Sequence, residues 1–451
     1  MQSLFIPASC LVLLTASAGE LEVVVRSRAT IIEQSGITGG GTPVKSADRV
    51  VSFFADHPDD FGATKGIGSA ISADGGQTWK KGLKNWPMKG MVSLWADRRK
   101  SGDLLAFGIH WLPDPAKRRD PEHQIAPRNA YQIGVSNDGG RTWNLARSTI
   151  RCPEEIGYIA RPLPHIIEDD KGMLFMPAYT WSRRGNKVVL LQSEDGGKAW
   201  EVRSVITTAI AMLKSGAKVT TPWLESSVSP TSEGGMLAIV RTGSTVRSAL
   251  VSVRSSDGGK TWSQATVLPF AGKLPTLHLL DNGVLTLTTA LSGNHCRVYL
   301  SVDGTGRKWS NAFVISSMTG GNVGSIISGK NNLLLTSSSN RRIDAWHLVI
   351  TPKPKETSDL APPSNPKLVD GILSWTPSPN AVAYRITPIL IKPGKSFQDT
   401  RIEPYSPILS PAAKLNLRRQ LLPDGIYGFM ISSANSSGQI SRPIRSEDFH
   451  L

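Results

Sequence analysis

The residues of this chain that could carry out chemistry do not form a short motif that identifies a reaction. The sequence has no phosphate-binding glycine loop, no Gly-x-Ser-x-Gly nucleophile turn and no Cys/His spacing typical of a metal site. Besides Cys10, the cysteines are Cys152 and Cys296, which we expect to be buried free thiols, with a disulfide between them as the alternative. The sequence therefore predicts no metal and no cofactor, and an active site has to be assembled by the fold.

A repeated pattern, Ser-x-Asp-x-Gly-x-x-Trp, organises most of the chain. Its copies and close variants span residues 72–79, 136–143, 193–200, 255–262 and 301–309. Successive aspartates of these boxes lie 64, 57, 62 and 46 residues apart, close to the roughly 40–50 residues of one four-stranded propeller blade. The Asp can accept hydrogen bonds from its own turn, the glycines can take positive φ, and the Trp can pack on the sheet. Each box therefore predicts a turn between two strands and serves folding rather than catalysis.

Short apolar segments between the boxes predict strands. Examples are Lys187–Gln192, Met236–Arg241 and Val284–Thr289, each bounded by Gly, Asn or Asp. With 42 glycines and 30 prolines and no long helical periodicity after the N-terminus, the body is predicted to be all-β. We expect a six-bladed β-propeller over residues 19–352, whose sixth blade combines Gly324–Ile350 with a strand near Glu22–Arg28 and so closes the ring.

The boxes resemble the Asp boxes of the sialidase superfamily, where they lie on the periphery, away from the substrate. The resemblance implies a glycoside hydrolase of exo-α-sialidase type, or a related glycan hydrolase, with its site at one end of the central channel. In that family an arginine triad binds the substrate carboxylate, a Tyr activated by a Glu is the nucleophile, and an Asp is the acid. The implied substrate is a glycan or glycoconjugate, which is acidic for a sialidase and acidic or neutral for a related hydrolase.

Several positions match that site by resemblance. Glu225, in Trp-Leu-Glu-Ser-Ser, corresponds to the activating Glu, and Arg241 follows at the spacing of the second triad Arg. Arg297, just before the fifth box, resembles the third triad Arg. Asp60 lies where the family places its acid, with Asp59 as the alternative.

Two expected residues are missing from the matching segments. Residues 40–43 read Gly-Gly-Thr-Pro where the family has its first triad Arg, so that Arg26 or Arg28 would have to replace it. No Tyr occurs between Tyr299 and Tyr384, the part of the chain that resembles the segment of the nucleophile. Loss of a covalent nucleophile can lower turnover on the order of 10⁶-fold.

Two functions from different classes therefore stay open. The first is a glycan hydrolase that uses Glu225, Asp60, Arg241 and Arg297. The second is a catalytically degenerate propeller that binds glycans or proteins without turnover. Tyr158 and Tyr179 are the remaining aromatic residues that could line the channel, as packing residues or as a surface on which a sugar stacks.

A second domain is predicted after the propeller. Residues 353–365 are rich in proline and polar residues and predict an exposed, stiff linker. Residues 366–451 resemble a fibronectin type III β-sandwich, including its buried Trp and its tyrosine-corner segment. The segments that carry this resemblance are Leu373–Trp375, Ala383–Ile386, Leu422–Tyr427 and Ser433–Gly438.

The N-terminus and the overall charge indicate where the protein acts. An apolar stretch over Leu4–Leu14, followed by Ala16-Ser-Ala18, predicts a signal peptide over residues 1–18, with a buried strand as the alternative. We therefore expect a secreted or periplasmic protein, and no later run approaches the roughly 20 apolar residues of a membrane span. The formal net charge of +15 favours polyanions. Because the basic residues are scattered, acidic glycans fit better than nucleic acid.

Overall fold

The structure is a computed structural model of the chain, and the regular secondary structure of its described part is almost entirely β-strand. The residues described are 20–55, 67–82, 93–110, 130–182, 185–221, 223–243, 248–291, 295–316, 322–338, 341–392, 401–417, 420, 422 and 425–451. One short α-helix, α1 (Ala209–Lys214), and one 3-10 turn, Glu154–Ile156, interrupt the strands. The predicted all-β fold class is confirmed. The predicted signal peptide, residues 1–18, lies outside the described residues, and no helix within them is long and apolar enough to cross a membrane.

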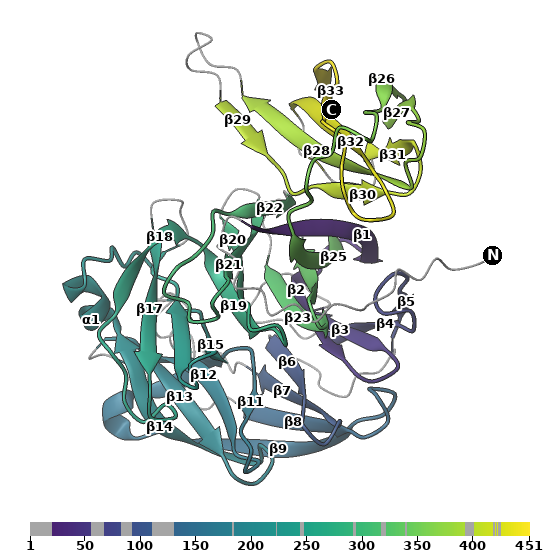
Figure 1. Cartoon of the computed structure of the whole chain (residues 1–451). Coiled ribbons are helices and arrows are strands. Elements are labelled where there is room, and N and C mark those ends of the chain that lie inside the picture. Colours follow the sequence, from purple (N-terminus) through teal and green to yellow (C-terminus); the bar gives the residue numbers. More distant parts are fainter. Residues whose placement is uncertain are drawn as a thin grey trace.

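The strands before residue 353 pair into antiparallel sets, here named A to F (Figure 1). Set A contains β2 (Thr38–Lys45), β3 (Val50–Ala55), β4 (Ile67–Ser72) and β5 (Lys80–Lys81). Set B contains β6 (Ser93–Arg98), β7 (Leu104–His110), β8 (Ala130–Ser136) and β9 (Asn144–Arg151). Set C contains β10 (Tyr158–Pro162), β11 (Ile167–Glu168), β12 (Leu174–Trp181), β13 (Lys187–Ser193) and β14 (Ala199–Thr208).

The remaining sets follow in chain order, except for one strand. Set D contains β15 (Ser226–Pro230), β16 (Met236–Val240), β17 (Ala249–Ser255) and β18 (Thr266–Ala271). Set E contains β19 (Lys273–Leu279), β20 (Leu285–Leu291), β21 (His295–Ser301) and β22 (Phe313–Ser316). Set F contains β23 (Val323–Gly329), β24 (Asn332–Ser338), β25 (Arg342–Pro352) and the N-terminal strand β1 (Leu21–Glu33). The predicted pairing of the N-terminal strand with the last propeller segment is thus present, because β1 pairs antiparallel with β25.

The boxes have the predicted turn geometry, shown here for set D. The Ser255 hydroxyl donates to Oδ1 of Asp257 at 2.8 Å, and the Thr261 hydroxyl donates to Oδ2 at 2.6 Å. The amide of Gly259 donates to the Ser255 hydroxyl oxygen at 2.9 Å. The hydrogen bonds from Thr261 and then from Ser255 hold the pKa of Asp257 well below its ordinary value.

The second glycine of each box also joins its set to the set before it. A Cβ atom placed on each of these glycines would meet a leucine or valine side chain of that neighbour: Gly76 meets Leu334, Gly140 meets Val51, Gly197 meets Leu105, Gly259 meets Leu190 and Gly306 meets Leu237. The first of these contacts joins set A to set F. Since β19 and β23 join sets E and F, the sets follow one another in a closed order, which is a β-propeller-like arrangement.

We expect Gly259→Ala to destabilise the protein by more than Gly258→Ala, although both glycines have positive φ in the same turn. A Cβ atom on Gly259 would lie 2.4 Å from Cδ2 of Leu190, whereas on Gly258 the nearest atom is a side-chain nitrogen of the half-buried Arg203 at 3.7 Å. The clash should add about 1–3 kcal/mol to the strain that the two variants share. Urea unfolding of both variants checks this, and equal losses of stability would contradict the packing described for the boxes.

Strands β26 to β34, after residue 363, form one separate small sheet and one larger sheet that continues the sheet of set F (Figure 1). The smaller sheet contains β26 (Ser364–Val369), β27 (Ile372–Thr376) and β31 (Lys414–Asn416). The larger one contains β28 (Ala383–Lys392), β29 (Arg401–Pro404), β30 (Ile408–Ser410), β32 (Ile426–Ala434), β33 (Ile444–Arg445) and β34 (Phe449–His450). Trp375 is buried between the sheets and contacts Tyr384 edge to face at 5.1 Å. In the segment before them Leu360 is buried and Glu356 bridges Ile440, so this segment lies against the C-terminal sheets.

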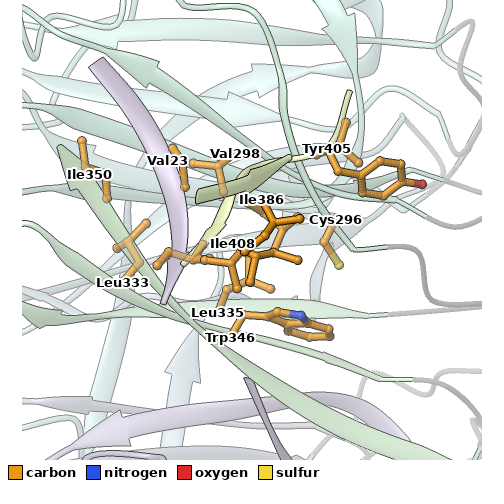
Figure 2. Packing of buried hydrophobic residues seen from close by; sticks show 14 of the residues in the cluster. Val23, Cys296, Val298, Leu333, Leu335, Trp346, Ile350, Ile386, Tyr405 and Ile408 are labelled. Carbon is orange, nitrogen blue, oxygen red and sulfur yellow. The ribbon is translucent and has the colours of Figure 1, made fainter. Parts of the chain in front are cut away.

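The C-terminal sheets share a hydrophobic core with the propeller-like body. One buried cluster contains Val23 of β1, Leu335 of β24 and Trp346 of β25 together with Ile386 and Ile408 (Figure 2). Main-chain contacts reinforce it, since β1 pairs in parallel with β30 and the Ser406 amide donates to the Val314 carbonyl at 2.8 Å. The two parts therefore pack as one hydrophobic unit and not as separate globular parts joined by a linker.

Both described cysteines are free thiols, as predicted, although only Cys296 is buried and Cys152 is half-buried. Burial raises the pKa of each thiol to about 11. Because the thiolate is the reactive form, neither side chain is a nucleophile near neutral pH.

Candidate active site

A cavity lies where the first strands of the sets meet. It is lined by residues of β2, β6, β10, β15, β19 and β23 or of their ends, among them Trp95, Arg161, His165, Glu225, Thr276 and Ser325. Its volume of about 50 Å³ is close to that of one or two water molecules. A saccharide could therefore place one substituent, such as a carboxylate, into the cavity.

Glu225 and Arg241 form a buried ion pair at this cavity. They are the next residues beyond the paired ends of β15 and β16, where Ser226 faces Val240, and the hairpin therefore brings them side by side. Nη1 of Arg241 lies 2.8 Å from Oε2 of Glu225, and the two residues are 8% and 7% exposed. The Leu274 amide donates to the same oxygen at 2.9 Å. The other oxygen, Oε1, accepts no hydrogen bond from the described residues.

Further cations surround Glu225. Lys273 lies close enough for its pKa to respond to Glu225 and Arg241, although burial is the main cause that lowers it. Arg161, on β10, lies over the Trp95 ring with its guanidinium carbon 5.2 Å from the ring centre. With Asp97, described below, the site contains three cations and two carboxylates, so it has an excess of positive charge and suits an anionic group.

A second pair of polar residues, Asp97 and His165, lies at the same cavity. Asp97, on β6, accepts from Nδ1 of His165 at 2.7 Å and from the Ile166 amide at 2.8 Å. Because a carboxylate accepts at Nδ1, neutral His165 carries its proton there and has a bare Nε2. This Nε2 is buried and has no hydrogen-bond partner in the described part of the chain.

His278 packs on His165 with a ring distance of 4.6 Å. Burial, followed by the neighbouring His165, holds the pKa of His278 well below its ordinary value. Its Nε2 donates to the Ser325 carbonyl at 2.9 Å. His278 is therefore a neutral ring that packs against His165.

The sequence-predicted site residues are only partly brought together. Glu225 and Arg241 form the ion pair described above. Arg297 lies on β21 in a different groove, which it lines together with Tyr299. Asp60 and its alternative Asp59 lie outside the described residues.

Arg28, one of the alternatives for the missing first Arg, lies on β1 and forms a buried ion pair with Asp344 at 2.9 Å. The Thr30 hydroxyl donates to the same carboxylate at 2.8 Å. Arg28 does not line the central cavity. Arg161, which sequence reasoning missed, is the arginine that does.

No tyrosine takes the place of the missing nucleophile. All seven tyrosines of the chain lie within the described residues, and none of their hydroxyls hydrogen-bonds Glu225 there. Burial raises the pKa of Tyr179, which also responds to Arg161 and Glu225, but its side chain is fully buried and does not line the cavity. Tyr158 packs edge to face on Trp181 at 6.3 Å. A tyrosine-nucleophile mechanism has no support in this geometry.

We expect Tyr179→Phe to leave any turnover within about tenfold of the parent and to change stability by less than about 1 kcal/mol, because its buried hydroxyl has no hydrogen-bond partner among the described residues. A nucleophile would instead lose on the order of 10⁶-fold. Tyr299→Phe, at a buried tyrosine away from the cavity, is the matched control. A loss above about 10³-fold for Tyr179→Phe alone, at unchanged melting temperature, would restore Tyr179 as the nucleophile.

Sequence reasoning missed Asp97, Arg161 and His165, because they belong to no repeat and to no known motif. The signal that could have found two of them is Arg161-Pro-Leu-Pro-His165, a charged and prolyl segment at the end of the first strand of set C. The first strand of a blade faces the channel, so polar residues there are candidates for a site. Among the described residues no group of three or more His, Cys, Asp or Glu side chains could hold a metal ion.

Comparison with known proteins gives a family for part of the chain. Residues 120–325 match the BNR repeat-like domain. A comparison with curated proteins finds no match.

Several solved structures have a similar fold. A protein of unknown function from Dyadobacter fermentans is 19% identical, with 74% of this chain and 99% of that chain covered and a TM-score of 0.53. The Hadza microbial sialidase Hz136 is 14% identical, with 70% and 66% covered and a TM-score of 0.52. The α-L-arabinanase of Penicillium chrysogenum is 14% identical, with 71% and 98% covered and a TM-score of 0.47. At such identities the likeness concerns the fold, which is the β-propeller-like fold of sialidases.

Proposed function

We propose that this protein, which carries a BNR repeat-like domain and has a sialidase-like fold, is a glycoside hydrolase of exo-α-sialidase type or a related glycan hydrolase. The observation that carries the proposal is the pair of unengaged atoms at one cavity, Oε1 of Glu225 and Nε2 of His165. Both groups are held by a second residue, Arg241 for Glu225 and Asp97 for His165. Such support keeps a reactive group in one orientation.

The two groups supply the functions that glycoside hydrolysis needs. One group must protonate the leaving oxygen, and a carboxylate must attack the sugar or activate water. Glu225 is the carboxylate of this scheme. His165, protonated at Nε2 and held by Asp97 at Nδ1, is the acid, and it becomes the base when a water is used in the second half of the reaction.

The charge of the site favours an acidic sugar as the substrate. Arg161, Arg241 and Lys273 outnumber the two carboxylates of the site. A carboxylate-sized substituent also matches the volume of the cavity. In this scheme Arg161 replaces the arginine that the family has before its first box, and Asp60 remains a further candidate acid.

The test is to incubate the protein with a fluorogenic sialoside and a panel of acidic and neutral oligosaccharides and to analyse the products by mass spectrometry. We expect cleavage of an acidic member. His165→Gln should lower kcat on the order of 10²–10⁴-fold, and Arg161→Gln should mainly raise KM. Cleavage that His165→Gln leaves unchanged would reject the proposed acid, and cleavage of neutral substrates alone would reject the acidic substrate.

A second candidate function is glycan or protein binding without turnover. It is favoured by the Glu225–Arg241 ion pair, which occupies one oxygen of the carboxylate, and by the absence of a tyrosine at Glu225 in the described part of the site. This function would be supported if the protein binds an acidic glycan, if Arg161→Gln weakens that binding, and if no member of the panel is cleaved.

We also propose the finer architecture and the location expected from the sequence. Sets A to F would be six blades, and residues 366–451 would be a fibronectin type III-like sandwich, which the burial of Trp375 supports. Cleavage of residues 1–18 would lead to a secreted or periplasmic protein. N-terminal sequencing of the exported protein tests this directly.

A further inference from the structure

A groove between sets D and E has the features of a second binding site. It lies between β17 and β18 on one side and β21 and the fifth box on the other. Its volume is about 570 Å³, within the usual range of roughly 300–1,000 Å³ for ligand pockets. None of its lining residues lines the central cavity, so the two surfaces are separate.

Three arginines line this groove: Arg254, Arg297 and Arg307. Arg254 is half-buried, donates to the Thr305 carbonyl at 2.6 Å and forms no ion pair with the described residues. Burial and then the nearby Arg307 lower its pKa, so two guanidinium groups lie close to each other. Arg307 is exposed and pairs with Glu233 at the surface. Glu233 and Asp303 offset part of this charge, so the groove contains three arginines against two carboxylates and has room for the charge of an anionic ligand.

Aromatic rings form the other part of the groove. Phe270 stacks on Tyr299 with ring centres 4.1 Å apart and planes at 17°. Trp309 of the fifth box meets Phe270 edge to face at 6.1 Å. Tyr299 is buried, while Phe270 and Trp309 are half-buried. The groove therefore offers the apolar surface of aromatic rings next to positively charged guanidinium groups.

We propose that this groove binds an acidic saccharide, a sugar chain that carries carboxylate or sulfate groups, at a site separate from the central cavity. Guanidinium forks bind both anions in a bidentate way, and aromatic faces suit the C–H surface of a sugar ring. Nucleic acid fits less well, because Phe270 and Tyr299 stack on each other and do not offer separate faces to successive bases. The proposal goes beyond the proposed function, since it needs no turnover.

The experiment measures binding of a heparin-derived tetrasaccharide, an oligogalacturonate tetramer and neutral maltotetraose by calorimetry at low and physiological salt. The first two distinguish sulfate from carboxylate as the recognised anion, and binding of either one supports the proposal. We expect Arg254→Gln/Arg307→Gln to raise the Kd at least about tenfold and the exposed single change Arg307→Gln to raise it about threefold. Arg151→Gln is the matched control, because Arg151 is likewise an exposed arginine paired with a glutamate, and its Kd should stay within about twofold.

Other variants separate the groove from the fold and from the central cavity. Arg254→Lys keeps the charge but removes the planar guanidinium group. We therefore expect a Kd between those of the parent and of Arg254→Gln/Arg307→Gln, at an unchanged melting temperature. Arg161→Gln, in the central cavity, should leave groove binding unchanged even if it abolishes cleavage. The proposal is overturned if the groove variants bind like the parent, if maltotetraose binds as well as the charged sugars, or if a single-stranded oligonucleotide binds better than both.

Discussion

Replacing Glu225 with alanine is expected to destabilise the protein by about 3–5 kcal/mol, because Arg241 would keep a buried charge without its partner. The carboxylate also accepts from the Leu274 amide, which would lose its acceptor in the same change. Chemical unfolding of the parent and of Glu225→Ala measures this loss. A loss below about 1 kcal/mol would mean that water reaches Arg241 freely.

Any turnover should fall on the order of 10⁴-fold or more in the same variant, since the catalytic carboxylate is gone. The variant alone cannot separate chemistry from stability. In Glu225→Leu/Arg241→Met both charges are replaced by apolar side chains of similar length, and we expect more than half of the lost stability to return. Turnover should stay lost. A double variant that is stable and active would exclude Glu225 from the reaction.

The second large effect concerns the shared core of the body and the C-terminal sheets. Ile408→Asp would place a carboxylate where β30 meets β1, at a side chain only 7% exposed. We expect a loss of about 3–5 kcal/mol or more, and a lower melting temperature for the whole protein rather than for the C-terminal sheets alone. Calorimetry with circular dichroism follows both parts.

The neighbouring residue provides the control. Leu409 lies on the same strand but is 38% exposed, so Leu409→Asp should change stability by less than about 1 kcal/mol. Two separate transitions in Ile408→Asp, with the body unchanged, would show that the C-terminal sheets are an independent module.

The sequence predicted those parts of the fold that depend on local chemistry. A box such as 255–262 contains its own donors, acceptors and glycines, so its turn could be recognised without knowledge of the rest. The strand predicted over Lys187–Gln192 corresponds to β13 for the same reason, since its apolar run is bounded by turn residues. The docking of Ile408 on β1 could not be predicted, because it depends on two surfaces that only the folded chain brings together.

The candidate site was predictable only where one hairpin forms it. Glu225 and Arg241 flank the paired ends of two strands, and their match to the spacing of the sialidase family indicated that they belong to one site. Asp97 and His165 come from different sets, and no spacing relates them. Arg297 was matched by its place before a box, but the box fixes only the turn and not the direction in which a strand residue faces.

The strand β1 has a consequence for how the chain reaches its native state. It completes set F through bonds such as that between Thr30 and Asp344, which are 314 residues apart, and its other edge pairs with β30. Such long-range pairing folds slowly, because a large loop must close before any contact forms. During synthesis both edges of β1 therefore stay without a partner strand until nearly the whole chain has been made. Folding should be late and cooperative, and a chaperone that covers the first strands should raise the yield.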